Sequence, residues 1–412
     1  MSVSSSDTTT ATTARKAAPQ LRSGRIVSID VFRALTVLVM IVVNQWGGVQ
    51  GLPTWMKHMP ADADAMSFVD VVFPAFLFIV GMSIPFALQQ RQALGDSWWQ
   101  RQSHVLQRAL GLIMIGVFMV NAEDGYHSAS MLLPIAAWAL LSYLAAFLIW
   151  GSVSAGPALS MLWRVTGIGL LLVLALLYHG GSEGQDGLTP QWWGILGLIG
   201  WAYLIACICF QLCRGRLPLL LFCIALCIAY FVAYRNPEIA AHPMLAMLFS
   251  QPGHFSHAAL VLCGCSTALI FFDQAVQRNS GQRFAAAIVF ALVLALIAAV
   301  MRPEYKISKI YASPSWVLYS AATCVLIFCA LYRWIDVRGN ALLPKLLAPV
   351  AANPLLAYLI PFILGAALQL GNLSLPAILN RPVPGVLFAL GFALALAWLV
   401  KQIAKSGIRL RI

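Results

Sequence analysis

The chain has 412 residues, of which 61% are hydrophobic and only 10% are charged, and its formal net charge at pH 7 is +12. Ordinary soluble domains carry about 25% charged residues, so this balance excludes a soluble globular protein. The basic residues gather in short segments between apolar runs, which is the pattern that membrane orientation requires. The positive charge therefore does not indicate a nucleic-acid partner.

Residues 1–24 are rich in Ser, Thr and Ala and show no apolar period. Such a segment cannot bury enough apolar surface to offset the entropy of ordering, so we predict a disordered cytoplasmic tail. The tail is also too polar to supply the apolar region of a signal peptide, and none is expected before the first span. Residues 25–412 are predicted to form a single transmembrane domain.

Apolar segments fill the rest of the chain, and each is long enough to cross a bilayer core as a helix, which takes about 20 residues. We predict an all-α, polytopic integral membrane protein with about twelve transmembrane helices, or about ten at the fewest. The predicted spans are 26–46, 67–90, 105–121, 131–150, 157–179, 191–211, 217–234, 256–272, 284–301, 315–333, 350–370 and 383–401.

The charges of the connecting segments alternate along the chain. Basic residues such as Arg91, Arg101 and Arg214 mark every second connection, whereas Glu123 and Glu183 stand in connections between them. Because cytoplasmic loops carry the excess of Lys and Arg, this alternation predicts that both termini lie in the cytoplasm. We expect the protein in the inner membrane of the cell.

One connection breaks this rule. Residues 301–314 are expected outside, but they carry Arg302, Lys306 and Lys309. Either one span is misplaced, or the connection is a cationic lid over an anionic or carbonyl-bearing ligand. The sequence leaves these two interpretations open.

Polar residues flank the first two spans. Asp30 and Arg33 are three residues apart and share a helix face, so they form a structural ion pair or also meet the phosphates of a cofactor. Asn44 ends the first span, where an amide caps a helix or stabilises an oxyanion. Asp70 opens the second span, either as a helix cap or as a partner that orients His58.

His58 lies between these two spans and is the residue best suited to proton transfer, because an imidazole titrates close to neutral pH. It is a general base, a nucleophile that carries an acyl group, or a solvated loop histidine. His254 and His257, three residues apart, are weighed as metal ligands, but no third ligand is visible and no metal is expected.

The segments 28–35, 43–44, 57–58 and 70–81 together resemble the heparan-α-glucosaminide N-acetyltransferase family, which belongs to the transmembrane acyltransferases. The later segments 309–316 and 353–354 also look like motifs of that family. The resemblance is dense over residues 25–90 and sparse over residues 302–360.

The resemblance implies an enzyme that uses cytosolic acetyl-CoA to acetylate an amino sugar on the far side of the membrane. His58 matches the active-site histidine of the family, Asp70 its acidic partner, and Asn44 the asparagine beside the acetyl group. The other residues that we expect in the site fall into two sets. Arg33, Asp30 and Asn353 are assigned to the cofactor, and Lys57, Lys309, Ser313 and His254 to the substrate.

We therefore expect a membrane-bound acetyltransferase that acts on an amino sugar or glycan, with membrane lipids around it. The alternative is a secondary transporter for a small polar or sugar-derived solute, since about twelve spans with an intramembrane carboxylate fit that class as well. A lipid-binding or scaffold-binding membrane protein would explain the composition but not the grouping of Asn44, His58 and Asp70. The acceptor, the choice between N- and O-acetylation and the formation of a homo-oligomer are left open.

Overall fold

The computed structural model of the protein describes residues 21, 26–152, 156–276, 278–407 and 409–410. Almost all of these residues are helical, which confirms the all-α, polytopic membrane fold. The predicted tail lies outside the described residues except for Leu21, whose backbone N–H donates a hydrogen bond to the side chain of Gln89.

A buried centre is formed by four helices, and α10 is the most enclosed of them. α10 packs against α2, α6, α7 and α12, so lipid reaches little of it, and almost every side chain along it is buried. The helices of this centre are α1 (Val27–Trp46), α2 (Val69–Ala93), α10 (Pro252–Phe272) and α12 (Pro314–Tyr332).

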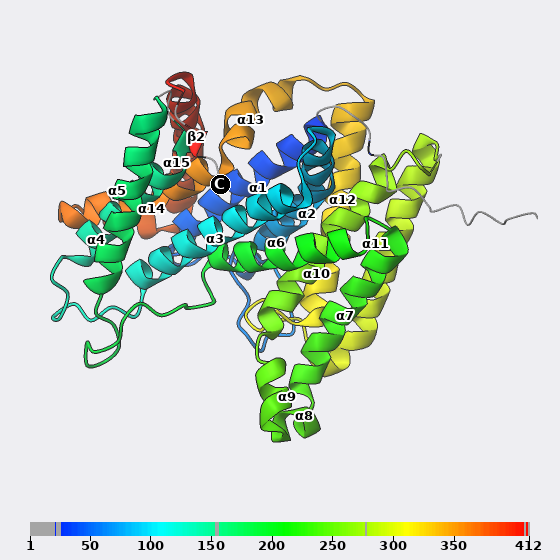
Figure 1. Ribbon diagram of the computed structural model, residues 1–412, viewed down its shortest axis with the longest axis horizontal. Coiled ribbons are helices and arrows are strands. Elements are labelled where there is room, and N and C mark those ends of the chain that lie inside the picture. Colours follow the sequence, from blue (N-terminus) through cyan, green and yellow to red (C-terminus); the bar gives the residue numbers. More distant parts are fainter. Residues whose placement is uncertain (1–20, 22–25, 153–155, 277, 408, 411–412) are drawn as a thin grey trace, which may run out of the picture.

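The remaining helices lie around this centre (Figure 1). Toward one end of the long axis are α4 (Ile135–Trp150), α5 (Pro157–Leu176) and α15 (Pro382–Lys405). α3 (Trp98–Glu123) runs from that end toward the middle, where α6 (Ile195–Leu212) packs against α3 and α10. Toward the other end are α7 (Leu217–Arg235), the short α8 (Pro237–Ala241) and α9 (Pro243–Leu248), and α11 (Ser280–Tyr305).

Short elements complete the described chain. Two-residue strands β1 (Gly151–Ser152) and β2 (Arg409–Leu410) pair antiparallel. Single turns of 3-10 helix are η1 (Thr54–Met56) and η3 (Ala377–Asn380), and η2 (Arg333–Val337) is a π-helical turn after α12.

Each predicted span corresponds to an apolar helix, but one span is not continuous. The segment predicted as 350–370 is broken into α13 (Leu342–Ala352) and α14 (Pro354–Leu370), which are bent by 67°. The break falls at Asn353 because the ring of Pro354 disfavours the helical conformation in the residue before it. Ten described helices are long and apolar enough to span a membrane, and the bent pair makes eleven; α4 is apolar but has only 16 residues.

Two glycines set the spacing of α2 and α10. A Cβ at Gly81 would overlap the backbone of Val261, and a Cβ at Gly264 would overlap the backbone of Phe78. Because neither glycine has a side chain, the two backbones lie in direct contact, and the Cys265 thiol donates a hydrogen bond to the Gly81 carbonyl at 3.2 Å. This contact fixes α2, whose first turn carries Asp70, against the most buried helix.

Replacement of Gly264 by Ala should therefore destabilise the protein by about 1–3 kcal/mol, because the added methyl group has to push the two backbones apart. Gly391→Ala on α15 is the matched control, since a Cβ there meets nothing within 4 Å and Ala favours the helix. Thermal unfolding in detergent gives the unfolding temperature of each of the two variants. Equal unfolding temperatures for the two variants would show that the close approach of α2 and α10 does not limit stability.

Candidate active site

His58 and Asp70 form a hydrogen-bonded pair at the start of α2. His58 Nδ1 lies 2.7 Å from Asp70 Oδ1. The Asp70 side chain is 1% exposed, whereas that of His58 is 47% exposed, so the carboxylate lies on the buried side of the imidazole. A carboxylate can only accept, so Nδ1 carries the proton and Nε2 keeps its lone pair for chemistry.

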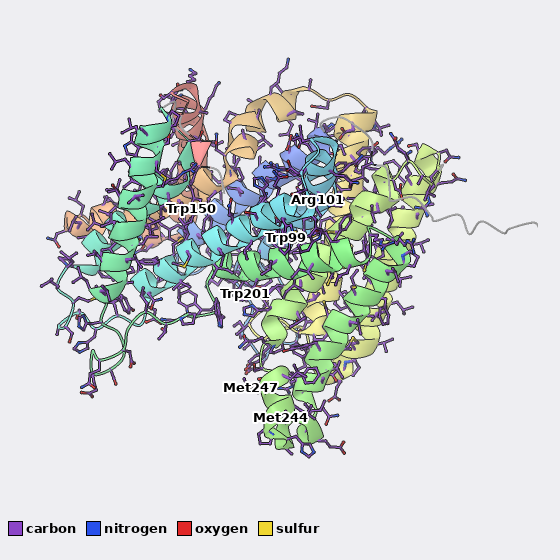
Figure 2. The ribbon with its side chains drawn as sticks, in the orientation of Figure 1. Trp99, Arg101, Trp150, Trp201, Met244 and Met247 are labelled. Atoms are coloured by element: carbon purple, nitrogen blue, oxygen red, sulfur yellow. The ribbon has the colours of Figure 1, made fainter. Side chains whose placement is uncertain are left out.

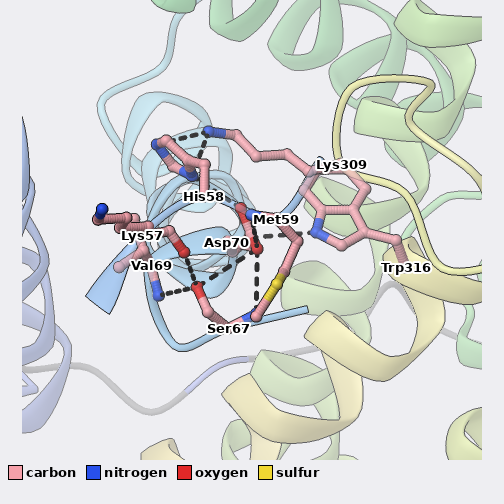
Figure 3. Close-up of polar contacts among 8 residues, drawn as sticks. All are labelled: Lys57, His58, Met59, Ser67, Val69, Asp70, Lys309 and Trp316. Atoms are coloured by element: carbon pink, nitrogen blue, oxygen red, sulfur yellow. Dashed lines mark hydrogen bonds and ion pairs between the residues drawn. The ribbon is translucent and has the colours of Figure 1, made fainter. Parts of the chain in front are cut away.

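The second oxygen of Asp70 holds the loop that carries His58 (Figure 3). Its Oδ2 accepts hydrogen bonds from the backbone N–H groups of Met59, at 3.2 Å, and Ser67, at 3.0 Å. The Ser67 hydroxyl donates to the carbonyl of Lys57 at 2.7 Å. Asp70 therefore fixes both the tautomer and the position of His58.

α12 supports the same helix turn from the other side. The indole N–H of the fully buried Trp316 donates to the backbone carbonyl of Asp70 at 3.1 Å. Segments 246 residues apart in the sequence thus meet at one residue of α2 (Figure 3).

Lys309 reaches the imidazole from the loop between α11 and α12. Its Nζ lies 3.1 Å from His58 Nε2 and 3.2 Å from Nδ1. Since Nδ1 donates to Asp70, Nε2 is the nitrogen that accepts from Lys309. Burial lowers the pKa of Lys309 below its ordinary value, and the negative charge of Asp70 opposes this shift only in part. Lys309 therefore holds its proton less tightly than a solvated lysine does.

A salt bridge joins the loop of His58 to the loop of Lys309. Arg302 Nε lies 3.1 Å from both carboxylate oxygens of Asp64, and the backbone N–H of Ile307 donates to Asp64 Oδ1 at 2.8 Å. The hydrogen bond from Ile307 is the main cause, followed by that from Arg302, of a lowered pKa of Asp64. These contacts of Asp64 with Arg302 and Ile307, which we call the Asp64 clamp, hold the segment of Lys309 close to His58.

His58 and Lys309 open into a cavity of about 850 Å³, which we call the histidine cavity. The side chains of its lining that carry a polar group come from seven separate segments of the chain. These lining residues are Asn44, Gln45, His58, Glu123, Trp192, Trp193, His257, Lys309, Tyr311, Trp316 and Tyr358.

A second cavity, of about 1150 Å³, adjoins the first, and we call it the arginine cavity. Its described lining includes five arginines and no carboxylate. These arginines are Arg33, Arg91, Arg101, Arg108 and Arg164, of which Arg101 is labelled in Figure 2. Ile195, Leu196 and Tyr358 line both cavities, so the two spaces meet at these side chains. A cavity of this charge suits a ligand with several phosphate groups.

Comparisons with known proteins place this arrangement in a family. A family model described as a domain of unknown function (DUF5009) matches residues 25–252, which is more than half of the chain. The chain belongs to this family. It is also 33% identical over 97 residues to the human heparan-alpha-glucosaminide N-acetyltransferase, and 33% identical over 99 residues to the mouse protein of the same name.

These two alignments cover 24% of this chain and 14% of each relative. The matched stretch thus spans about a seventh of the relatives' length. The identity nevertheless supports a relationship between this DUF5009 chain and the membrane acetyltransferases.

The residues predicted for catalysis lie together in this DUF5009 protein. Asn44 and His58 both line the histidine cavity, and Asp70 lies directly behind His58. The role of each residue stays a prediction, but their grouping is a feature of the structure.

The residues predicted for the cofactor lie at the other cavity. Arg33 lines the arginine cavity and is held by Asp30 at 2.9 Å and by the hydroxyl of Ser83 at 2.8 Å. Asn353 is buried at the break between α13 and α14, and within the described chain neither polar atom of its amide finds a hydrogen-bond partner. Its neighbours Ala352 and Pro354 line the cavity, while Asn353 itself is not among the lining residues.

The residues predicted for the substrate are less uniformly placed. Lys309 lines the histidine cavity, but Lys57 is exposed and points away from His58 (Figure 3). The Ser313 hydroxyl is buried and caps α12, since it donates to the carbonyl of Lys306 and accepts from the N–H of Trp316. His254 is buried with its ring 5.3 Å from that of Trp192 and 5.5 Å from that of Trp201, also outside the cavity lining.

Sequence reasoning missed several residues of the histidine cavity. Glu123 was read only as a loop charge, and His257 only as a metal ligand beside His254. Among the described residues, no group of three or more His, Cys, Asp or Glu side chains is arranged to hold a metal ion. Glu123 could have been noticed as a carboxylate at the end of a long apolar helix, whereas Trp192 and Trp193 carried no distinguishing signal.

Removal of the Asp64 charge should loosen the clamp. Asp64→Asn keeps the left-handed backbone at this position, where φ is 44°, because Asn tolerates that region. The pKa of Asp64 is lowered by folding from its ordinary value of 3.8, so its contribution to stability is present above that value and is lost as the pH falls through the folded pKa. At pH 7 the variant should unfold at a lower temperature than the wild type.

The difference in unfolding temperature should begin to shrink as the pH falls below about 4, where the unfolded carboxylate becomes protonated, and it should close only below the lower pKa of the folded state. Asp62→Asn is the control, because it removes a charge from the same loop without breaking an ion pair of the described chain. A difference that persists unchanged at pH 3 would rule out the charge of Asp64 as its cause.

Proposed function

We propose that this protein is a membrane-bound acyltransferase that moves an acetyl group from cytosolic acetyl-CoA to an amino sugar or glycan at the extracytoplasmic face. The observation that carries the proposal is that a cavity lined by arginines shares wall residues with a cavity lined by His58, whose imidazole is hydrogen-bonded to the buried Asp70. The relationship to named N-acetyltransferases supports the same class of reaction.

In this proposal the arginine cavity binds the donor. Guanidinium groups form paired hydrogen bonds with phosphates, and a nucleotide part of CoA carries several phosphates in one compact region. The thioester arm would pass Tyr358, which lines both cavities, and bring the acetyl group to Asn44 and His58. Arg33 and Asn44 are eleven residues apart on α1, a rise of about 16 Å, so the donor would extend along this helix.

His58 is the general base of the proposed transfer. An amine or hydroxyl group of the acceptor gives its proton to Nε2 and forms a bond with the carbonyl carbon of the thioester. The carbon–sulfur bond then breaks, and the CoA thiolate leaves and takes up a proton, so the imidazole returns to its neutral form. Asp70 stabilises the imidazolium that forms between these steps.

In the proposal, Lys309 and Asn44 stabilise the carbonyl oxygen of the thioester. Lys309 hydrogen-bonds Nε2 in the structure, so an acceptor that binds there has to displace the lysine amine. The displaced amine and the amide of Asn44 would donate to the oxygen that becomes negative when the acceptor attacks.

His58→Asn should lower turnover by about two to four orders of magnitude, because an amide keeps polarity but cannot accept the proton. Asp70→Asn should also lower turnover, by leaving the imidazole in the wrong tautomer. Release of free CoA thiol from acetyl-CoA with a panel of hexosamines is the measurement, with the acetyl-CoA-dependent rise in unfolding temperature as the control for an intact donor site. If His58→Asn releases thiol at a near-normal rate, the role of His58 is wrong.

Acetyl-CoA should raise the unfolding temperature of the purified protein, because a ligand that binds only the native state stabilises it by mass action. Arg33→Gln should weaken acetyl-CoA binding about tenfold or more, which is the usual scale for losing a hydrogen bond between two charged groups. Arg214→Gln removes a charge from an exposed loop that does not line the arginine cavity and is the matched control. If millimolar acetyl-CoA does not change the unfolding temperature, the result would favour the alternative function, a secondary transporter.

In the proposed orientation the protein lies in the inner membrane of the cell, with Lys57 on the extracytoplasmic side. Both termini and the basic connections lie on the cytoplasmic side. Lys57→Cys, at an exposed position, should react with a membrane-impermeant thiol reagent added to intact cells, whereas Arg214→Cys should react only after the cells are opened. Wild-type protein gives the background from the native cysteines. Reaction of both variants in intact cells would overturn the orientation.

A further inference from the structure

The histidine cavity has a second imidazole that the proposed reaction does not use. His257 lies on α10, lines the cavity together with His58 and Lys309, and is 5% exposed. Its Nδ1 is buried and makes no hydrogen bond within the described chain. Because buried polar groups are almost always hydrogen-bonded, a buried ring without a partner on a cavity wall indicates a contact that forms with another group in the cavity.

Two aromatic rings hold this imidazole in place. The ring of Phe73 lies 5.3 Å from that of His257 and the ring of Trp316 lies 6.0 Å from it, both at edge-on angles. Phe73 stands three residues after Asp70 on α2, and the indole of Trp316 donates a hydrogen bond to the carbonyl of Asp70. His257 is therefore packed against the same turn of α2 that positions His58.

Lys309 lies between the two imidazoles. Its Nζ is 3.1 Å from Nε2 of His58, and its charge also acts on the ring of His257. Within the described chain no hydrogen bond joins Lys309 to His257, so in this arrangement His58 holds the amine and His257 does not. A lysine amine carries three donors on a flexible stem, so it can exchange one nearby partner for another.

Binding of the acceptor creates the need for such an exchange. In the proposed reaction the acceptor takes the place of the Lys309 amine at Nε2 of His58. An ammonium group that loses its hydrogen-bond partner in a partly buried site costs free energy, so it turns to another lone pair. A neutral imidazole has one lone pair, and with the proton of His257 on Nδ1 this lone pair is on Nε2.

A carboxylate of the same cavity is less well placed to receive the amine. The carboxylate whose charge acts on Lys309 is that of Asp70, which already accepts from His58. Glu123 also lines the cavity, but it acts on Tyr143 and Tyr358 instead. Since Tyr358 lines both cavities, Glu123 lies on the side of their junction.

We propose that His257 is a positioning residue for Lys309. Once the acceptor displaces the amine from His58, Nε2 of His257 accepts one of its N–H groups and directs another at the carbonyl oxygen of the thioester. The inference rests on the proposed acyltransferase function and adds a residue to its site. No covalent bond forms or breaks at His257, and only the hydrogen-bond partner of Lys309 changes.

The test is a double-mutant cycle in the thiol-release assay. His257→Phe keeps a ring between Phe73 and Trp316 but removes both nitrogens. It should lower kcat/KM for the acceptor about tenfold or more, the scale of a lost hydrogen bond to a charged group, while the KM for acetyl-CoA stays within about twofold. In the Lys309→Met background the same change should alter kcat/KM by less than about twofold. His257→Gln, which restores an acceptor oxygen, should recover most of the lost activity.

A structural effect of the substitution gives a different result. If His257→Phe causes the same loss with and without Lys309, the ring only supports the packing and the proposal is overturned. His254→Phe is the matched control on the same helix, since His254 does not line the cavity, and any effect that it has should be equal in the two backgrounds. A loss that depends on Lys309 for Glu123→Gln, but not for His257→Phe, would assign the amine to the carboxylate and also overturn the proposal.

Thermal unfolding tests the contact without turnover. His58→Phe removes the partner that Lys309 has in the structure, so the amine should turn to His257. His257→Phe should then lower the unfolding temperature more in the His58→Phe protein than in the wild type, and the excess should disappear when Lys309→Met is added. If no acceptor releases thiol, the acyltransferase function fails, and this measurement still tests His257. Equal decreases in the three backgrounds would show that His257 does not receive the lysine amine.

Discussion

The buried carboxylate of Asp70 is the interaction on which the geometry of the site depends. One of its oxygens accepts from His58, and the other accepts from two backbone N–H groups of the loop that carries His58. Asp70 stands in the first turn of α2, where the helix dipole favours a negative charge, and α2 is fixed against α10 by the contacts at Gly81 and Gly264. The loop that carries His58 is thereby fixed to a helix whose own position is set by close packing.

The second constraint joins two connections that are distant in the sequence. The salt bridge between Asp64 and Arg302 brings the loop after α11 to the loop before α2, and Lys309 reaches His58 as a result. Of the two interpretations left open for this basic connection, the structure supports a loop that covers the histidine cavity, since Lys309 and Tyr311 both line it. Two of its positive charges have partners in the structure, since Arg302 pairs with Asp64 and Lys309 contacts His58.

The apolar segments predicted the helices because the length and hydropathy of a span are properties of a continuous stretch of sequence. The proximity of His58 and Asp70 was also within reach, since only twelve residues separate them and one opens a helix. The contact of Lys309 with His58 spans 251 residues, and no local pattern encodes it. Ser313 is assigned to the substrate from the sequence, whereas in the structure its hydroxyl caps α12.

The match to the DUF5009 family ends at residue 252, and this limit separates what similarity can assign from what geometry has to supply. Asn44, His58, Asp70 and Glu123 lie inside the matched region. Three residues that matter to the site lie beyond it. Lys309 contacts His58, Trp316 donates a hydrogen bond to the helix turn of Asp70, and Tyr358 lines both cavities. Each cavity is lined by residues from both sides of residue 252, so both cavities form only when the two parts of the chain pack together. The two cavities also differ in charge, because the described lining of one includes five arginines and no carboxylate, whereas the other is lined by both Glu123 and Lys309.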